Sequence, residues 1–255
     1  MLLTIDVGNT NITIGAFKGE CLLKTWRIAT RSDRTIDEYR LMFRAFLEEV
    51  DSSNGLVHGC VISSVVPNVT PLITETVRHL WAVDALVVGP GVKSGIKVRG
   101  DNPREVGADR IVNAVATYQF YPTPAIVVDC GTAISFDVIT DKGEYIGGAI
   151  APGVGMVSDA LVVRTAKLKR VELNRPVRAI GRNTEECMQS GIVFGYIGLI
   201  EYILDKIANE LNEEPYVVFT GGQGGVLINE FKDRYTHDPE LTLKGLQIIA
   251  KLNGW

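Results

Sequence analysis

Two short turns at the ends of apolar strands carry the residues best suited to chemistry in this chain of 255 residues. The first turn reads DVGNTN from Asp6, and the second reads DCGT from Asp129. Glycine lets the backbone approach an anion, while N–H groups, hydroxyls and amides donate to phosphate oxygens. A strand-end carboxylate suits a hydrated divalent metal. The turns predict phosphate and cation binding, although an ordinary hairpin turn also explains either one alone.

A third candidate is Asp109, which with Arg110 opens a helix-like apolar pattern. Phosphoryl transfer to an alcohol needs a carboxylate beside the acceptor hydroxyl and positive charge around the phosphate. Asp109 can be that carboxylate, and Arg110 can orient an anionic substrate. The alternative is an adjacent Asp-Arg pair on a solvated helix start.

The elements that hold these turns repeat along the chain. Asp6 and Gly8 recur 123 residues later as Asp129 and Gly131. In each copy an apolar strand precedes the turn, an alternating strand follows it, and a Lys-Gly-Glu turn comes next. This ordered recurrence predicts a duplicated α/β unit, with domains at residues 1–118 and 119–255.

Apolar periodicity predicts the remaining elements. We expect helices at residues 34–50, 70–81 and 184–211, and strands at 57–66, 85–88, 125–128 and 216–219. Asn183 is the expected N-cap of the last helix, with Glu186 as its capping-box partner. Residues 220–225 form a third glycine-rich turn, which would lie against adenosine or would simply start or end a helix. The chain contains neither a Walker A loop nor a Gly-x-Gly-x-x-Gly turn.

Composition excludes several classes of function. The net charge of −4 gives no basic field for nucleic acid or an anionic membrane. We find no stretch approaching the ~20 apolar residues of a membrane span and no secretory signal. The four cysteines lack zinc or disulfide spacing, and the three histidines lie outside every motif. We therefore expect a cytoplasmic protein.

Five motifs resemble one family when taken together. They are DVGNTN at Asp6, GADR at Gly107, DCGTA at Asp129, GAIAPG at Gly148 and G-x-N-T at Gly181. Their order and spacing resemble type III pantothenate kinase, of the acetate kinase/sugar kinase/Hsp70/actin superfamily, over nearly the whole chain. The resemblance implies two duplicated ribonuclease H-like (actin-like ATPase) domains, each a mixed sheet flanked by helices, with an interdomain cleft. It also implies ATP-dependent phosphorylation of pantothenate to 4'-phosphopantothenate, the first step of coenzyme A biosynthesis.

The resemblance further implies a role for each matched residue. ATP would be bound by Asp6, Val7, Gly8, Asn9, Thr10, Asn11, Ile12, Thr13 and Thr132. Pantothenate would be bound by Gly107, Ala108, Asp109, Arg110 and Thr184, with Asp109 as proton acceptor. Asp129 would bind a monovalent cation, K⁺ or NH₄⁺, and Mg²⁺ would accompany ATP beside Asp6. Thr184 would reach pantothenate across the interface of a homodimer with a composite active site.

Two departures from the family pattern affect the acceptor side. Gly100 stands where the family often has a tyrosine, so a ring contact to pantothenate is absent or supplied elsewhere. Residues 167–170 are basic and form either a solvated face or a charged cleft rim. Two other functions stay open: a superfamily kinase or phosphatase with another substrate, and a non-catalytic regulator of the transcription accessory type. Intact Asp6, Asp109 and Asp129 argue against the regulator.

Overall fold

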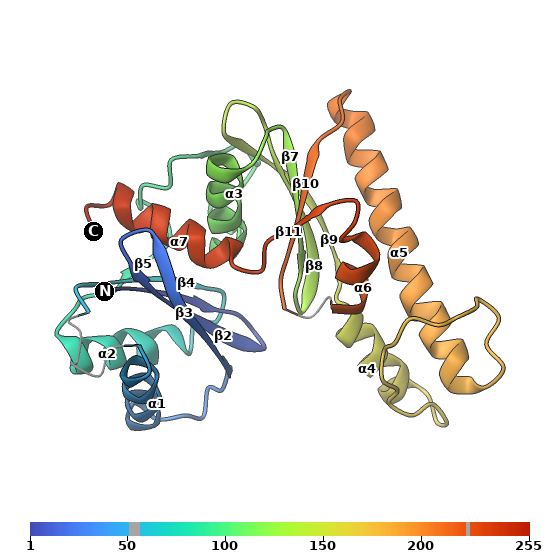
Figure 1. Ribbon diagram of the computed structural model, residues 1–255, viewed down its shortest axis with the longest axis horizontal. Coiled ribbons are helices and arrows are strands. Elements are labelled where there is room, and N and C mark those ends of the chain that lie inside the picture. The colour runs from blue at the N-terminus through green and yellow to red at the C-terminus, as the bar shows by residue number, and fades with distance from the viewer. Residues whose placement is uncertain (51–56, 223–224) are drawn as a thin grey trace. The chain divides into compact units, whose positions relative to one another are not determined.

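The computed structural model describes residues 1–50, 57–222 and 225–255, coloured along the chain in Figure 1. Contacts divide the chain into two compact units. Unit 1 comprises residues 1–119 together with 240–255, and unit 2 comprises residues 120–239. The expected domain division at residues 118 and 119 stays a prediction, but the last sixteen residues group with unit 1 because their helix packs on its sheet.

Unit 1 is built on a mixed five-stranded sheet with the order β3-β2-β1-β4-β5. The strands are β1 (Leu2–Val7), β2 (Asn11–Lys18), β3 (Cys21–Ala29), β4 (Gly59–Ser64) and β5 (Leu86–Val87). β1 runs antiparallel to β2 and parallel to β4. The carboxyl ends of β1 and β4 therefore meet at one edge of the sheet, where α/β folds commonly bind ligands.

Helices cover both faces of this sheet (Figure 1). The helices are α1 (Ile36–Glu48), α2 (Thr70–Trp81), α3 (Ala108–Phe120) and α7 (Leu241–Leu252). Side chains of α1 and α2 share one buried cluster with Ile5 and Ile62. Side chains of α3 and α7 share another with Leu2 and Val61. Because neighbouring residues of a strand point to opposite faces, the even residues of β1 face α3 and α7.

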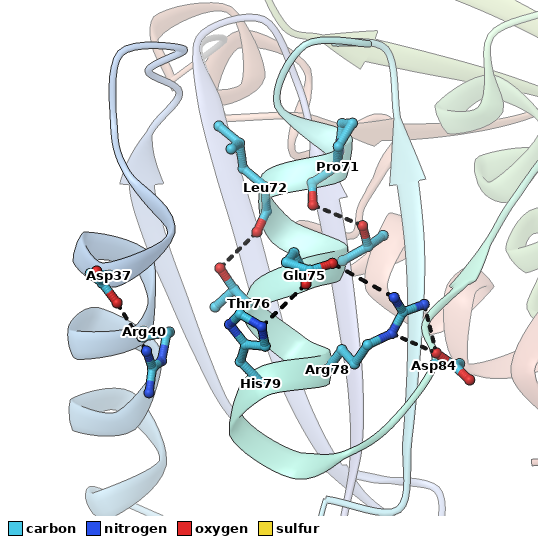
Figure 2. Close-up of polar contacts among 10 residues, drawn as sticks. Asp37, Arg40, Pro71, Leu72, Glu75, Thr76, Arg78, His79 and Asp84 are labelled. Carbon is cyan, nitrogen blue, oxygen red and sulfur yellow. Dashed lines mark hydrogen bonds and ion pairs between the residues drawn. The ribbon is translucent and has the colours of Figure 1, made fainter.

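The outer surface of α2 holds ion pairs rather than a site (Figure 2). Arg78 pairs with Asp84 at 2.9 Å, and the His79 Nε2 lies 3.2 Å from a Glu75 oxygen. His79 is thus a surface residue of a structural helix.

Unit 2 repeats the strand pattern. Its strands β7 (Ala125–Cys130), β8 (Ala133–Ile139), β9 (Glu144–Pro152), β10 (Tyr216–Thr220) and β11 (Thr236–His237) run in the order β11-β10-β7-β8-β9. One face is covered by α4 (Val154–Arg164), α5 (Thr184–Leu211) and α6 (Gly225–Phe231), whose side chains pack with Ile126 and Phe136. The antiparallel pair β7–β8 and the parallel pair β7–β10 match the pairing of β1 with β2 and β4.

The expected α/β class with mixed sheets and flanking helices is confirmed. Helices α2 and α5 begin and end where the apolar spacing placed them, and Asn183 accepts the Glu186 N–H at 2.9 Å as the N-cap. The Glu186 carboxylate accepts from the backbone N–H of Arg182 and from the side-chain amide of Asn183. Sequence periodicity did not reveal α4, α6 or α7, nor the short segments β6 (Lys97–Val98) and η1 (Pro103–Glu105).

The expectation that no segment approaches the ~20 apolar residues of a membrane span was wrong. Within the described residues, α5 is long and apolar enough to cross a bilayer by length and composition alone. Its Ile192, Tyr196 and Ile200 are buried against the sheet of unit 2. A core helix passes the same test, so we interpret the apolar character of α5 as packing.

Candidate active site

The first predicted turn lies at the sheet edge where β1 and β4 end. Asp6 is half-buried and pairs in register with Thr13 on one side and Ser63 on the other. The Gly8 N–H donates to the Asn11 carbonyl at 3.0 Å and so closes the turn internally. Exposed Asn9 and Thr10 present polar side chains at the tip of the turn.

Asp109 lies beside the same edge of unit 1. It is the second residue of α3, and its carboxylate accepts the Arg110 N–H at 2.8 Å. A Cβ added at Gly107 would lie 2.5 Å from that carboxylate and 3.7 Å from Val65 Cγ1. Val65 follows β4 and donates its N–H to Val7 at the end of β1. These contacts bring Asp109 to the strand ends that carry Asp6.

Burial sets the acid–base character of Asp109. Desolvation raises the pKa of its carboxyl above the ordinary aspartate value, and the N–H and charge of Arg110 oppose part of that rise. A carboxylate with a raised pKa is a stronger base once it has lost its proton. Its place in the first turn of a helix also puts backbone N–H groups nearby that favour an anionic ligand.

The second predicted turn is organised around the Asp129 carboxylate in unit 2. A Cβ on Gly221 would lie 2.5 Å from its Oδ1, and one on Gly131 would lie 3.7 Å away. The sheet thus brings the third glycine-rich turn to the second one, as β10 pairs with β7. Gly221 and Gly222 are described, whereas Gln223 and Gly224 lie outside the described residues. Burial, with Asp129 as a second cause, raises the pKa of the Cys130 thiol to about 12.

The two turns share an internal hydrogen bond. Gly131 donates to the Ala133 carbonyl at 3.0 Å, just as Gly8 donates to Asn11. The bond spans two residues in the second turn and three in the first. The second turn is therefore one residue shorter than the first, and the missing residue lies between the glycine and the threonine. For this reason the Asp and Gly residues of the two copies are 123 residues apart, whereas Thr10 and Thr132 are 122 residues apart.

The Gly148 motif supports Thr132. The Gly153 N–H donates to the Thr132 carbonyl at 2.9 Å, and a Cβ at Gly153 would come within 2.1 Å of that oxygen. Tyr196 of α5 donates its hydroxyl to the Pro152 carbonyl at 2.8 Å. Helix α5 therefore holds the end of β9 in place, and β9 fixes the turn that contains Thr132.

Thr184 is the first residue of α5 and is exposed. It borders an apolar groove of about 660 Å³ between α4 and α5. Gly191 and Gly195 line this groove, and a Cβ at either would meet nothing within 4 Å. The prediction that these glycines share one helix face and leave room for close approach agrees with this geometry.

One polar cluster escaped the sequence interpretation. Asp137 is fully buried in β8 and accepts hydrogen bonds from Tyr145 at 2.9 Å and Ser135 at 2.8 Å. Ser135 in turn pairs in register with Asp129. A lone aspartate inside an apolar strand pattern was the available signal, because a buried carboxylate must have partners.

The described residues contain no group of three or more His, Cys, Asp or Glu side chains that could hold a metal alone. Single carboxylates such as Asp6 and Asp129 fit cations whose other ligands are phosphates, backbone oxygens or water. At Gly100 an added Cβ would meet nothing within 4 Å. Residues 167, 169 and 170 are exposed, and Arg170 pairs with Asp159.

Comparison with known proteins gives a consistent family. The family description of type III pantothenate kinase matches residues 2–206. A protein of that name from Moorella thermoacetica is 50% identical over 99% of this chain and 100% of its own length. Another, from Dehalococcoides mccartyi, is 44% identical over 99% of this chain and 96% of its own.

Solved structures with low identity show the fold. A Campylobacter jejuni protein described under a Baf family of transcriptional activators has a TM-score of 0.62 at 22% identity, covering 98% of each chain. The ROK hexokinase of Thermus thermophilus has a TM-score of 0.50 at 14% identity, covering 99% of this chain and 98% of its own. The actin-like kinase fold expected from the motifs is therefore confirmed.

Proposed function

The chain belongs to the type III pantothenate kinase family and phosphorylates pantothenate with ATP, and we propose that Asp109 accepts the proton of the acceptor hydroxyl. The observation that carries this assignment is the half-buried carboxylate at the start of α3, beside the strand ends that hold Asp6. Its raised pKa suits a group that must take a proton from an alcohol during phosphoryl transfer. Gly107, Ala108 and Arg110 would form the rest of the pantothenate site around it.

ATP would be bound by the two glycine turns. We assign its phosphates to the first turn, residues 6–13, and to Thr132 in the second. Asn9 and Thr10 are exposed at the turn tip and have the donors that phosphate oxygens require. Asp6 would hold a water or oxygen ligand of the Mg²⁺ that accompanies ATP, and this ion would supply screening of the phosphate charge.

The proposed cation site gives a first expected result. With ATP and pantothenate saturating, the wild-type protein should form phosphopantothenate faster in potassium than in sodium alone. Asp129→Asn should lose this potassium response and about 10²-fold in kcat, because one charge that organises the phosphate site is removed. A coupled assay in the two salts measures both effects. Equal activity of the wild type in both salts would contradict the assignment of a monovalent cation site to Asp129.

The homodimer is a second expected result. The open groove with Gly191 and Gly195, together with exposed Ile150 and Met156, leaves apolar surface that a second copy would cover. Thr184 borders that groove and would then reach the partner's substrate. We expect sedimentation at twice the 27.8 kDa chain mass, and a shift toward monomer in Gly195→Arg. Glu213→Arg, at an exposed loop position, is the control. A monomeric wild type would contradict the proposal.

We infer the cellular compartment from the reaction and from the redox state of the cysteines. All four cysteines are free, as expected for a reducing compartment. We assign the protein to the cytoplasm, where its substrate ATP is available. Cell fractionation with detection of the native protein tests this directly.

A further inference from the structure

A buried serine beside Asp6 has no hydrogen-bond partner in the described residues. Ser63 of β4 is fully buried, and its hydroxyl oxygen is unpaired. A buried hydroxyl without a partner is unfavourable, and such groups are rare in native proteins. The next residue shows the usual outcome: the Ser64 Oγ accepts from the Val66 N–H at 3.1 Å and from the Thr70 hydroxyl at 2.7 Å.

The sheet register places Ser63 next to one predicted ligand-binding residue. Ser63 pairs with Asp6 across the parallel strands β4 and β1, so their side chains lie on the same face. Paired strands are about 4.8 Å apart, and one χ1 rotation changes the direction of a serine hydroxyl by about 120°. Ser63 is closed to solvent, whereas Asp6 is half-buried. A ligand at the surface can therefore contact Asp6, whereas the Ser63 hydroxyl is closed to it.

We infer that Ser63 is a positioning residue, which donates its hydroxyl hydrogen to the Asp6 carboxylate when Mg·ATP binds. The unpaired hydroxyl is then satisfied in the nucleotide complex, and the carboxylate is held with one oxygen toward the ligand. This rests on the proposed role of Asp6 in binding ATP. The buried Ser63 hydroxyl destabilises the free protein, but it is hydrogen-bonded in the nucleotide complex. Ser63 therefore contributes to nucleotide affinity and not to the stability of the fold.

The pair Ser63→Ala and Ser64→Ala separates these contributions. Ser63→Ala should melt at or above the wild-type temperature without ligand, since it removes an unpaired buried hydroxyl. Its KM for Mg·ATP should rise about tenfold, with an unchanged KM for pantothenate. Ser64→Ala should melt lower than the wild type and keep its KM for Mg·ATP. In an Asp6→Ala background, which lacks the acceptor, Ser63→Ala should cause no further loss in kcat/KM.

Melting in the presence of Mg·ATP provides a readout that does not depend on the acceptor. Mg·ATP should raise the melting temperature of Ser63→Ala less than that of the wild type. If pantothenate is not phosphorylated but this difference remains, the positioning role stands and the proposed function fails. If Ser63→Ala instead melts lower without ligand and binds Mg·ATP normally, Ser63 is structural and the inference is overturned. An unchanged response in all assays overturns it equally.

Discussion

Replacing Asp109 with asparagine is expected to lower kcat by about 10²–10⁴-fold, while the protein folds as before. Asparagine keeps an oxygen that can accept the Arg110 N–H, now at 2.8 Å from the carboxylate, so the start of α3 should be preserved. The substitution would remove the group that we propose takes a proton from the acceptor hydroxyl. Steady-state kinetics with both substrates saturating measures the effect.

An exposed carboxylate serves as the control for this substitution. Asp141→Asn, at the exposed turn between β8 and β9, removes the same charge and should leave kcat unchanged. Wild-type turnover in Asp109→Asn would remove this residue from the mechanism.

The pH profile of the wild type should report the same group. The base must be ionised, so kcat/KM falls as pH drops through the Asp109 pKa. Burial raises that pKa, so the fall should begin at a higher pH than the ordinary aspartate value of about 3.9 would give. The acidic limb should disappear from the residual activity of Asp109→Asn.

The second large effect is expected at Gly221. Its φ of 94° is unfavourable for any side chain, and a Cβ there would lie 2.5 Å from the Asp129 carboxylate and 2.7 Å from Cys130 backbone atoms. Gly221→Ala should lower the free energy of unfolding by about 2–5 kcal/mol, from backbone strain and overpacking together. It should also weaken potassium activation, because Asp129 must move.

Gly91 offers a matched control. It has the same φ of 94°, but an added Cβ meets nothing within 4 Å. Gly91→Ala therefore carries the backbone strain alone, about 1–2 kcal/mol, and should respond normally to potassium. Thermal melting and potassium titration of both variants distinguish the effect of backbone strain from the effect of the close contact with Asp129. Equal effects in the two variants would show that the contact with Asp129 is unimportant.

Sequence patterns predicted the elements that have one-sided or continuous apolar spacing. The α2 and α5 boundaries followed from such spacing and from the Asn183 cap. Of the helices that were missed, α4 follows a Pro-Gly turn and α6 is only seven residues long. Helix α7 does have one-sided apolar spacing, and the sequence interpretation overlooked it. The packing of α7 in unit 1 could not be predicted, since it depends on contacts with β1 and β4, which lie more than 170 residues earlier in the chain.

The candidate site was predicted residue by residue but not in its contacts. Motif spacing identified Asp6, Asp109 and Asp129, yet gave no reason to connect Gly221 with Asp129 or Gly107 with Asp109. Those connections depend on strand pairing and on how closely two backbones approach. The internal bond of Gly8 was likewise invisible, since it depends on the conformation of the turn rather than on residue type.

The return of α7 to the first sheet has a consequence for biosynthesis. Leu243, Leu246 and Ile249 of this helix pack with Leu2, Phe17 and Val61. During synthesis α7 emerges more than 170 residues after β1 and β4. Part of one apolar face of the first sheet therefore stays uncovered until α7 has been made, whereas residues 120–239 contain all the elements of unit 2. Loss of α7 would expose that part of the face to water and favour aggregation.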